Sequence, residues 1–139
     1  MSVPVYSVDM DEPTSKVRLL MKEHGFHHVP VVHRGVLVGL LSASDLLHLH
    51  YGDFGVSGRY LDVFLDERYP IRGLMSRDLV TLRNTDTIAR AAELLSDSRM
   101  HALPVVGEGG RLKGLVTSTD LCRCIVLFAA EAQARRTVD

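Results

Sequence analysis

Gly39-Leu40-Leu41-Ser42-Ala43-Ser44-Asp45-Leu46 is matched later in the chain by Gly114-Leu115-Val116-Thr117-Ser118-Thr119-Asp120-Leu121. Each stretch is an apolar run that ends in hydroxyl side chains and one carboxylate. A strand that only fills a core needs no polar ending, so the hydroxyl-x-x-Asp pattern indicates a helix cap or a binding site. Because the pattern occurs twice, it also predicts a duplicated structural unit.

A second pair of matching stretches supports the duplication. Val29-Pro30-Val31-Val32 aligns with Leu103-Pro104-Val105-Val106 at nearly the same offset along the chain. The offset grows by one position after the next turn, because residues 107–110 form a turn one residue longer than residues 33–35. A change of offset that occurs only at a turn is typical of duplicated units that differ by a surface insertion.

Each copy is predicted to form a strand, a helix, two strands and a second helix. In the first copy, residues 5–8 are extended, and Pro13 suits the first position of a helix that Gly25 ends. Residues 29–32 and 36–41 are apolar runs on either side of a Gly-containing turn, which predicts a buried hairpin. Ser42 or Ser44 is expected to cap the following helix.

The second copy is predicted to follow the same order. Residues 79–82 are extended, a helix begins near Thr87, and the last helix runs from Thr119 to about Arg135. Pro30 and Pro104 are both expected at the start of a strand, where proline costs no ladder hydrogen bond. Between the copies, residues 48–70 contain three glycines and then a predicted short helix over residues 60–65.

Composition narrows the class of protein. The 139 residues suffice for one domain or for two small repeats that share a core. A net charge of -1, with no Trp and only 4 Tyr and 4 Phe, argues against nucleic-acid binding. Cys122 and Cys124 lie two apart in a predicted helix, where they cannot easily form a disulfide. With no leader pattern and no apolar run near the ~20 residues of a membrane span, we expect a cytoplasmic protein that is not in a membrane.

The paired motifs resemble a tandem pair of cystathionine-β-synthase (CBS) domains, and residues 71–77 resemble the segment that leads into the second domain of such a pair. The resemblance implies an α/β (α+β) fold in which two βαββα repeats pack about a pseudo-twofold axis with two clefts between them. The expected boundaries are residues 3–50 for the first repeat, 51–70 for an insertion and 71–135 for the second repeat.

The resemblance also implies a function. Such pairs bind adenosine compounds, often form dimers, and regulate another protein rather than catalyse a reaction. We therefore expect a regulatory module that binds an AMP, ADP or ATP type of nucleotide, pairs as a homodimer and signals to an unidentified effector protein. The alternative is a degenerate module that only dimerises and binds no ligand. No enzymatic motif such as Gly-x-Ser-x-Gly or a Walker loop is present, which agrees with a non-catalytic role.

Asp45 and Asp120 are the predicted ribose ligands. A carboxylate can accept hydrogen bonds from both hydroxyls of a ribose, and a position one turn into a helix holds it rigidly. The hydroxyls of Ser42 and Thr117 can contact either a phosphate or the helix amides. The alternative interpretation is that both motifs are capping boxes, and the two roles are compatible.

The phosphate ligands are assigned by the resemblance to the two positions before each hydrophobic-Pro pair. His101 would then serve the Asp45 cleft, whereas His27 and His28 would serve the Asp120 cleft. Ala102 departs from the basic pattern of the family, which argues against tight polyphosphate binding at the Asp45 cleft. Arg99 is a further phosphate candidate, or it covers the end of the preceding helix. The histidines can also be ordinary exposed loop residues.

The base would lie against backbone groups near the first strand of each repeat, at Tyr6-Ser7 and Val80-Thr81. Tyr6 could stack on the base, or it could be a core tyrosine with its hydroxyl at the surface. The first half of the chain is rich in histidine but lacks the ligand spacing and the nearby Cys of a zinc site. We therefore expect no metal site and no cofactor, apart from the nucleotide as a regulatory ligand.

Overall fold

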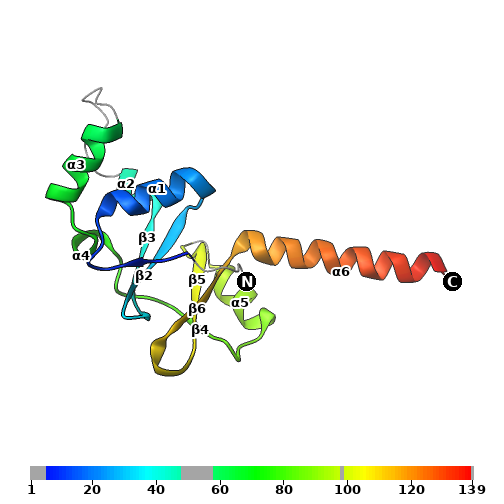
Figure 1. Ribbon diagram of the computed structural model, residues 1–139. Helices are drawn as coiled ribbons and strands as arrows, with labels where there is room; N and C mark the ends of the chain where they lie inside the picture. The colour runs from blue at the N-terminus through cyan, green and yellow to red at the C-terminus, as the bar shows by residue number, and fades with distance from the viewer. Residues whose placement is uncertain (1–5, 48–57, 98, 139) are drawn as a thin grey trace. The chain divides into compact units, whose positions relative to one another are not determined.

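The computed structural model describes residues 6–47, 58–97 and 99–138, and these form a mixed α/β fold with two separate three-stranded sheets (Figure 1). The βαββα order occurs twice, which confirms the predicted fold class. Contacts divide the chain into a first unit, made of Tyr6–Leu79 with Glu108–Leu112, and a second unit, whose described parts belong to Val80–Gly107 and Lys113–Asp139. The first unit contains β1 (Val8–Asp9), α1 (Thr14–His24), β2 (His28–His33), β3 (Val36–Ser42), α2 (Ala43–Leu47), α3 (Gly58–Arg68), α4 (Ile71–Leu74) and the single turn η2 (Glu108–Gly110).

The sheet of the first unit has β2 at its centre, parallel to β1 and antiparallel to β3. The hairpin of β2 and β3 pairs His28 with Ser42 at one end and His33 with Val36 at the other, which confirms the predicted hairpin. Its turn places Arg34 at φ 51° and Gly35 at φ 82°. Two successive residues with positive φ are the geometry of a tight hairpin turn that matches the twist of the strands.

Pro30 is not at the start of its strand, as the sequence suggested, but is the third residue of the central strand β2. The structure accommodates it because β1 pairs only with Val31 and Val32, so no bond on that side is lost. On the other side Pro30 faces Leu40, whose backbone N–H and C=O instead bond to Ser76 at 3.0 and 2.9 Å. Proline therefore occupies a position of the hairpin that needs no N–H donor.

The helix α1 begins and ends near the predicted residues. Gly25 ends it in the left-handed conformation at φ 69°, and its N–H donates to the Met21 carbonyl at 2.9 Å, which confirms the predicted cap. Pro13 is the residue before the helix rather than its first residue. The strand β1 comprises Val8–Asp9 and so lies later than predicted, while Val5 falls outside the described residues.

The core of the first unit lies between its sheet and the helices that pack against the sheet. α3, which begins within the predicted insertion, packs on α1 through polar contacts. Ser15 donates to Asp66 from its backbone N and its hydroxyl, at 2.8 and 2.7 Å, and Arg18 pairs with Asp62 at 3.1 Å. The buried apolar residues of this core are Val8, Val17, Val29, Val31, Leu41, Leu46, Ile71 and Met75.

The second unit contains β4 (Leu82–Arg83), α5 (Ile88–Leu95), β5 (Ala102–Val106), β6 (Leu112–Thr117) and α6 (Ser118–Val138), with β5 at the centre of its sheet. Only Leu82 of the predicted extended segment 79–82 belongs to β4. Thr87 caps α5, because its hydroxyl accepts the Arg90 N–H at 3.1 Å. The buried core consists of Leu82, Ala91, Leu95, Leu103 and Val105.

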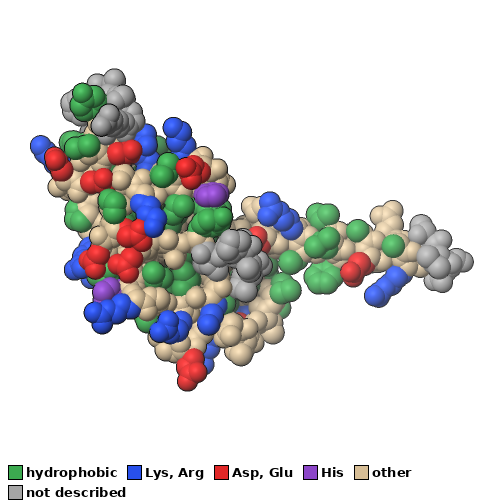
Figure 2. Space-filling model, in the orientation of Figure 1, with side chains coloured by type: hydrophobic (Ala, Val, Ile, Leu, Met, Phe, Trp, Pro, Cys, Tyr) green, Lys and Arg blue, Asp and Glu red, His purple; other side chains and the backbone are tan. Residues whose placement is uncertain are grey.

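The last helix, α6, extends beyond the sheet of its own unit (Figure 1). Leu121 packs against the core, but the apolar run from Ile125 to Phe128 is 60–66% exposed. Figure 2 shows apolar side chains along this helix with only a few charges among them. Both cysteines are free, as predicted. Within the described part of the chain, no helix combines the length and the apolar character needed to cross a membrane.

Candidate functional site

The hydroxyl-x-x-Asp motif of the first repeat joins the end of β3 to the start of α2. The Ser42 N–H donates to Asp45 Oδ2 at 2.7 Å, and the Asp45 N–H donates to Ser42 Oγ at 3.2 Å. This reciprocal pair is a capping box, with Asp in place of the usual Glu. Of the two serines proposed as caps, Ser42 forms these bonds, and its Oγ also lies 2.7 Å from Ser44 Oγ.

The motif of the second repeat has the same geometry at the start of α6. The Thr117 N–H donates to Asp120 Oδ2 at 2.8 Å, and the Asp120 N–H donates to Thr117 Oγ1 at 3.3 Å. The Thr117 hydroxyl additionally donates to Asp120 Oδ2 at 3.0 Å. The capping interpretation of both motifs is therefore correct, and the threonine holds its carboxylate by one bond more than the serine does.

Capping is compatible with ligand binding by the same carboxylate. Asp45 and Asp120 are both half-buried, and each accepts its cap bond at Oδ2. Among the described residues, no hydrogen bond is made to Asp45 Oδ1. An ionised carboxylate has about four acceptor positions, so one fixed oxygen still leaves room for a hydroxyl donor. The cap orients the carboxylate in advance, which lowers the entropic cost of binding.

His27 and His28 lie at the same edge of the first sheet as the Ser42 motif. The His27 carbonyl accepts the Ala43 N–H at 2.8 Å, and His28 begins β2 opposite Ser42. The imidazole of His27 belongs to an exposed residue, and His28 is half-buried. The sequence placed these residues near a predicted site, and the first unit brings their backbone next to Ser42 and Ala43 of the Asp45 motif. Their assignment to Asp120 stays a prediction.

The corresponding segment of the second repeat is held by a local ion pair. Arg99 Nη2 lies 3.1 Å from Asp97 Oδ2, and the Arg99 backbone N–H donates to Asp97 Oδ1 at 3.0 Å. Hydrogen bonding to the Arg99 side chain lowers the pKa of Asp97, and the same bond raises the pKa of Arg99. A phosphate would have to compete with Asp97 for this guanidinium. His101 is exposed, whereas Ala102 is buried at the start of β5.

Tyr6 belongs to an aromatic cluster that sequence reasoning did not identify. Its ring centroid lies 4.5 Å from that of His24 and 5.2 Å from that of Phe26, and the rings of His24 and Phe26 stack at 5.0 Å. Tyr6 is 39% exposed, and Ser7 beside it is half-buried. The only signal in the sequence was the pair of rings on either side of the Gly25 cap.

Val80 and Thr81 occupy the positions before β4 that Tyr6 and Ser7 occupy before β1, in the same alignment of the two repeats. Val80 is 40% exposed and Thr81 is exposed. Each repeat thus presents two accessible residues at the N-terminal end of its first strand. Their contact with a base stays a prediction.

A family model described as the CBS domain matches residues 1–52 and 71–127 of this chain. The chain belongs to the CBS-domain family. It carries two such domains, as the resemblance predicted, and the described residues have the fold of a CBS pair.

The CBS relatives differ in length and in kind. An uncharacterized protein, MJ1225 of Methanocaldococcus jannaschii, is 29% identical over 116 residues, which cover 81% of this chain and 40% of the relative. Inosine-5'-monophosphate dehydrogenase of Korarchaeum cryptofilum is 29% identical, over 84% of this chain and 21% of the enzyme. The CBS domain-containing protein YhcV of Bacillus subtilis is 27% identical, over 87% of this chain and 79% of the relative. The chain therefore spans less than half of the first two proteins.

Solved CBS structures share this fold. CBSX2 in complex with AMP superposes with a TM-score of 0.71 at 25% identity and covers 90% of both chains. The CBS domain pair of MJ0100, in complex with 5'-methylthioadenosine and S-adenosyl-L-methionine, gives a TM-score of 0.69 at 22% identity and covers 94% of this chain and 93% of that one. The second likeness concerns the fold alone.

Proposed function

We propose that this chain is a regulatory CBS pair that binds an adenosine nucleotide, such as AMP, ADP or ATP, with Asp45 and Asp120 as ribose ligands. The observation that carries the proposal is the repeated capping box, in which the same carboxylate is oriented by the same backbone bond in both repeats. A cap alone requires no carboxylate at this position, because a serine or threonine hydroxyl already caps the helix. The additional charged acceptor suits a pair of ribose hydroxyls.

The CBSX2 structure supports the adenosine class. That protein is described in complex with AMP, and it shares its fold and a quarter of its sequence with this chain. The nucleoside is therefore the part of the ligand for which the support is strongest, and the number of phosphates is the finer part of the proposal.

For the phosphates we propose His27 and His28, with His101 and Arg99 as the corresponding groups of the second repeat. The charge on Arg99 is already balanced by Asp97, so its contribution to phosphate binding should be smaller than that of a histidine pair. Replacement of His27 by Ala should weaken ADP binding more than adenosine binding, because only ADP carries the phosphates that the imidazole would contact.

Isothermal titration calorimetry with AMP, ADP, ATP and S-adenosylmethionine tests the ribose assignment. Asp45→Asn and Asp120→Asn keep a cap acceptor but remove the charge, and each should weaken binding roughly tenfold or more at its site, since hydrogen bonds to charged groups contribute about 1.5–3 kcal/mol. Asp86→Asn is the matched control, because Asp86 also accepts a backbone N–H, from Arg83 at 2.8 Å, outside both motifs. The proposal fails if no adenosine compound binds, or if the double variant binds like the wild type.

A second candidate function is a structural module that dimerises without a ligand. The packing of Tyr6 against His24 and Phe26 favours it, because these two rings already contact the Tyr6 ring on which a base could otherwise stack. The same calorimetry separates the two candidates. If a nucleotide binds and the Tyr6 ring contacts its base, Tyr6→Ala should lower the affinity. If the ring does not contact the base, the affinity of Tyr6→Ala should equal that of the wild type.

The partner side of the proposal is a homodimer that transmits ligand binding to an effector protein. The four consecutive exposed apolar residues of α6 from Ile125 to Phe128 support an interface, because burying an exposed apolar patch stabilises the complex that covers it. Light scattering with size-exclusion chromatography should give the mass of a dimer, and Phe128→Ser should lower that mass. A monomer at all concentrations would contradict the homodimer.

A further inference from the structure

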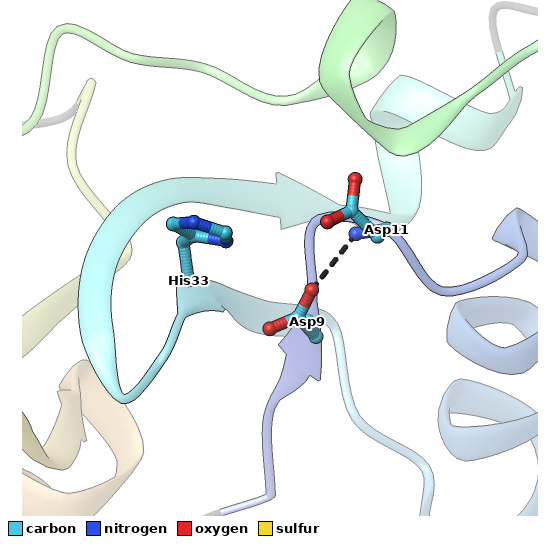
Figure 3. A group of neighbouring side chains, drawn as sticks. All are labelled: Asp9, Asp11 and His33. Atoms are coloured by element: carbon cyan, nitrogen blue, oxygen red, sulfur yellow. Dashed lines mark hydrogen bonds between the residues drawn. The ribbon is translucent and has the colours of Figure 1, made fainter.

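Three potential metal ligands meet at the end of the first sheet that is remote from the Ser42 motif. Asp9, Asp11 and His33 each offer one ligand atom, and these atoms all lie within 4.8 Å of one another. Figure 3 shows the three side chains converging from different parts of the backbone. Asp9 ends β1, Asp11 lies in the turn before α1, and His33 ends β2. The whole of α1 separates His33 from the two carboxylates in the sequence, so no short motif could have predicted this cluster.

The backbone holds the cluster in place. The Asp11 N–H donates to Asp9 Oδ1 at 3.0 Å, and the Asp9 N–H donates to Glu12 Oε1 at 3.0 Å. These two hydrogen bonds fix the Asp9 carboxylate and the turn that carries Asp11.

His33 supplies an independent observation. Its Nδ1 atom is buried and has no hydrogen-bond partner among the described residues. A buried polar atom without a partner is costly, and native proteins rarely tolerate one that has no function. Coordination through Nδ1 to a cation held by the two carboxylates would give this atom a partner.

The charges around the cluster are compatible with a bound cation. Two carboxylates that approach each other disfavour their shared ionisation unless positive charge lies nearby. Arg72 supplies part of this charge, because it forms an ion pair with Asp11 through Oδ1. The Arg72 side chain is 52% exposed, so the pair is solvated and the guanidinium can yield to a more highly charged ion.

We propose that Asp9, Asp11 and His33 bind a divalent first-row transition-metal ion such as Zn²⁺ or Mn²⁺, which fastens the turn between β1 and α1 to the β2–β3 hairpin. One imidazole with two carboxylates suits these ions better than Mg²⁺ or Ca²⁺, which take oxygen ligands. In the tetrahedral geometry of Zn²⁺, two ligand atoms at about 2.0–2.1 Å from the ion lie about 3.3–3.4 Å apart, which is closer than the 4.8 Å within which the three ligand atoms lie here. A small rotation of the exposed Asp11 therefore completes the site, and water fills the remaining positions.

The site is separate from the proposed nucleotide site. The hairpin pairs His33 with Val36 at one end and His28 with Ser42 at the other, which is about 17 Å along the strand at the usual rise per residue. The second repeat has Arg83, Thr85 and Gly107 at the positions equivalent to the three ligands. Arg83 cannot bind a cation, so the second repeat is an internal control.

Titration of the nucleotide-free protein with Mn²⁺, followed by the paramagnetic broadening of ¹⁵N–¹H NMR signals, tests both binding and location. The amides of Asp9, Asp11 and His33 should broaden first, no second centre of broadening should appear at Arg83 and Thr85, and added Zn²⁺ should reverse the broadening. His33→Ala and Asp11→Asn should each weaken Mn²⁺ binding at least about tenfold, as loss of a ligand does.

Asp78→Asn and His24→Ala are the matched controls, because they remove an exposed carboxylate and an exposed imidazole of the same unit outside the cluster. Both should retain the wild-type affinity. Asp11 is an exposed residue, so Asp11→Asn should fold even if His33→Ala does not. Broadening centred on other residues, equal affinity in Asp11→Asn, or no broadening at all would overturn the proposal. None of these results depends on whether a nucleotide binds.

Discussion

Val17 of α1 and Ala91 of α5 occupy equivalent positions in the two repeats, but the cores around them are built differently. In the first unit the core also takes in Ile71 and Met75, which follow the first repeat in the chain, and α3 packs over α1. In the second unit the corresponding helix α5 leaves Ile88 55% exposed. The duplicated pattern therefore specifies the same strands and helices twice, whereas, among the described residues, the stretch from α3 to Met75 completes the core of the first unit and has no counterpart in the second.

Thr14 and Ile88 show the same contrast at one position. Thr14 is buried and donates its hydroxyl to the Tyr69 carbonyl, although a threonine is more often exposed. Ile88, at the equivalent position of the second repeat, is apolar and exposed. The chemical character of the side chain does not decide burial here. What decides it is whether a later segment covers that face of the helix.

The largest expected effect is a loss of stability when Ile71, which helps to cover the core of the first unit, is truncated. Ile71→Ala should lower the free energy of unfolding by about 2–5 kcal/mol, because a fully buried isoleucine is replaced by a cavity. Ile88→Ala should cost no more than about 0.5 kcal/mol, as expected for an exposed position. Urea denaturation followed by circular dichroism measures both. Equal losses would mean that α5 is covered as well as α1.

Gly39, in the strand β3, tests how closely Met75 packs on the sheet of the first unit. A Cβ atom at this position would lie 2.8 Å from Met75 Cγ, so Gly39→Ala should cost about 1–3 kcal/mol by overpacking. The double variant with Met75→Ala should be more stable than the sum of the two single losses predicts, because the contact with Met75 Cγ is removed and only the tight contact with the Cβ atom at 3.0 Å remains. Additive losses in the same denaturation experiment would show that Met75 is not the obstacle.

The two capping boxes should differ slightly in strength. Ser42→Ala and Thr117→Ala should each cost about 1 kcal/mol, the usual value for a lost helix cap. The loss at Thr117 should be the larger, because its hydroxyl also donates to Asp120. Ser118→Ala, at an exposed neighbouring hydroxyl, is the control. The same loss at Ser118 as at Thr117 would contradict the assigned cap.

The smallest effect is expected at the C-terminal ends of α1 and α5. α1 ends at Gly25, whereas α5 is followed by the exposed ion pair of Asp97 and Arg99. Because the folded-state pKa of Asp97 is lowered from 3.8, its stabilising effect is present above pH 3.8 and is lost as the pH falls below that value. NMR titration should show the Asp97 midpoint below 3.8, and Arg99→Gln should raise it. An unchanged midpoint in the variant would exclude Arg99 as the cause.

Much of the fold could be predicted because the signals are local. The hairpin of β2 and β3, the Gly25 cap and the helix after Ser42 follow from turn residues, apolar runs and capping patterns within a few positions. The wrong prediction about Pro30 concerns a tertiary neighbour. Pro30 lies inside a central strand because Leu40 turns its backbone bonds toward Ser76, a partner that no local pattern of Pro30 reveals.

The candidate site was predictable in part for the same reason. Asp45 and Asp120 stand three residues after their hydroxyl partners, so the repeated spacing alone pointed to them. The cluster of Tyr6, His24 and Phe26 could not be predicted, because nothing near Tyr6 indicates which residues of a later helix end will contact its ring.

The sequence by itself determined the duplication, the order of strands and helices, the capping boxes and the membership of the CBS family. These features depend on spacing and residue type within short segments, which the chain carries whatever its surroundings. Only the tertiary structure decided that α3 covers α1, that Met75 crowds Gly39, and that His33 meets Asp9 and Asp11. Such contacts join residues far apart in the chain, and their energies depend on a geometry that exists only once both segments have folded.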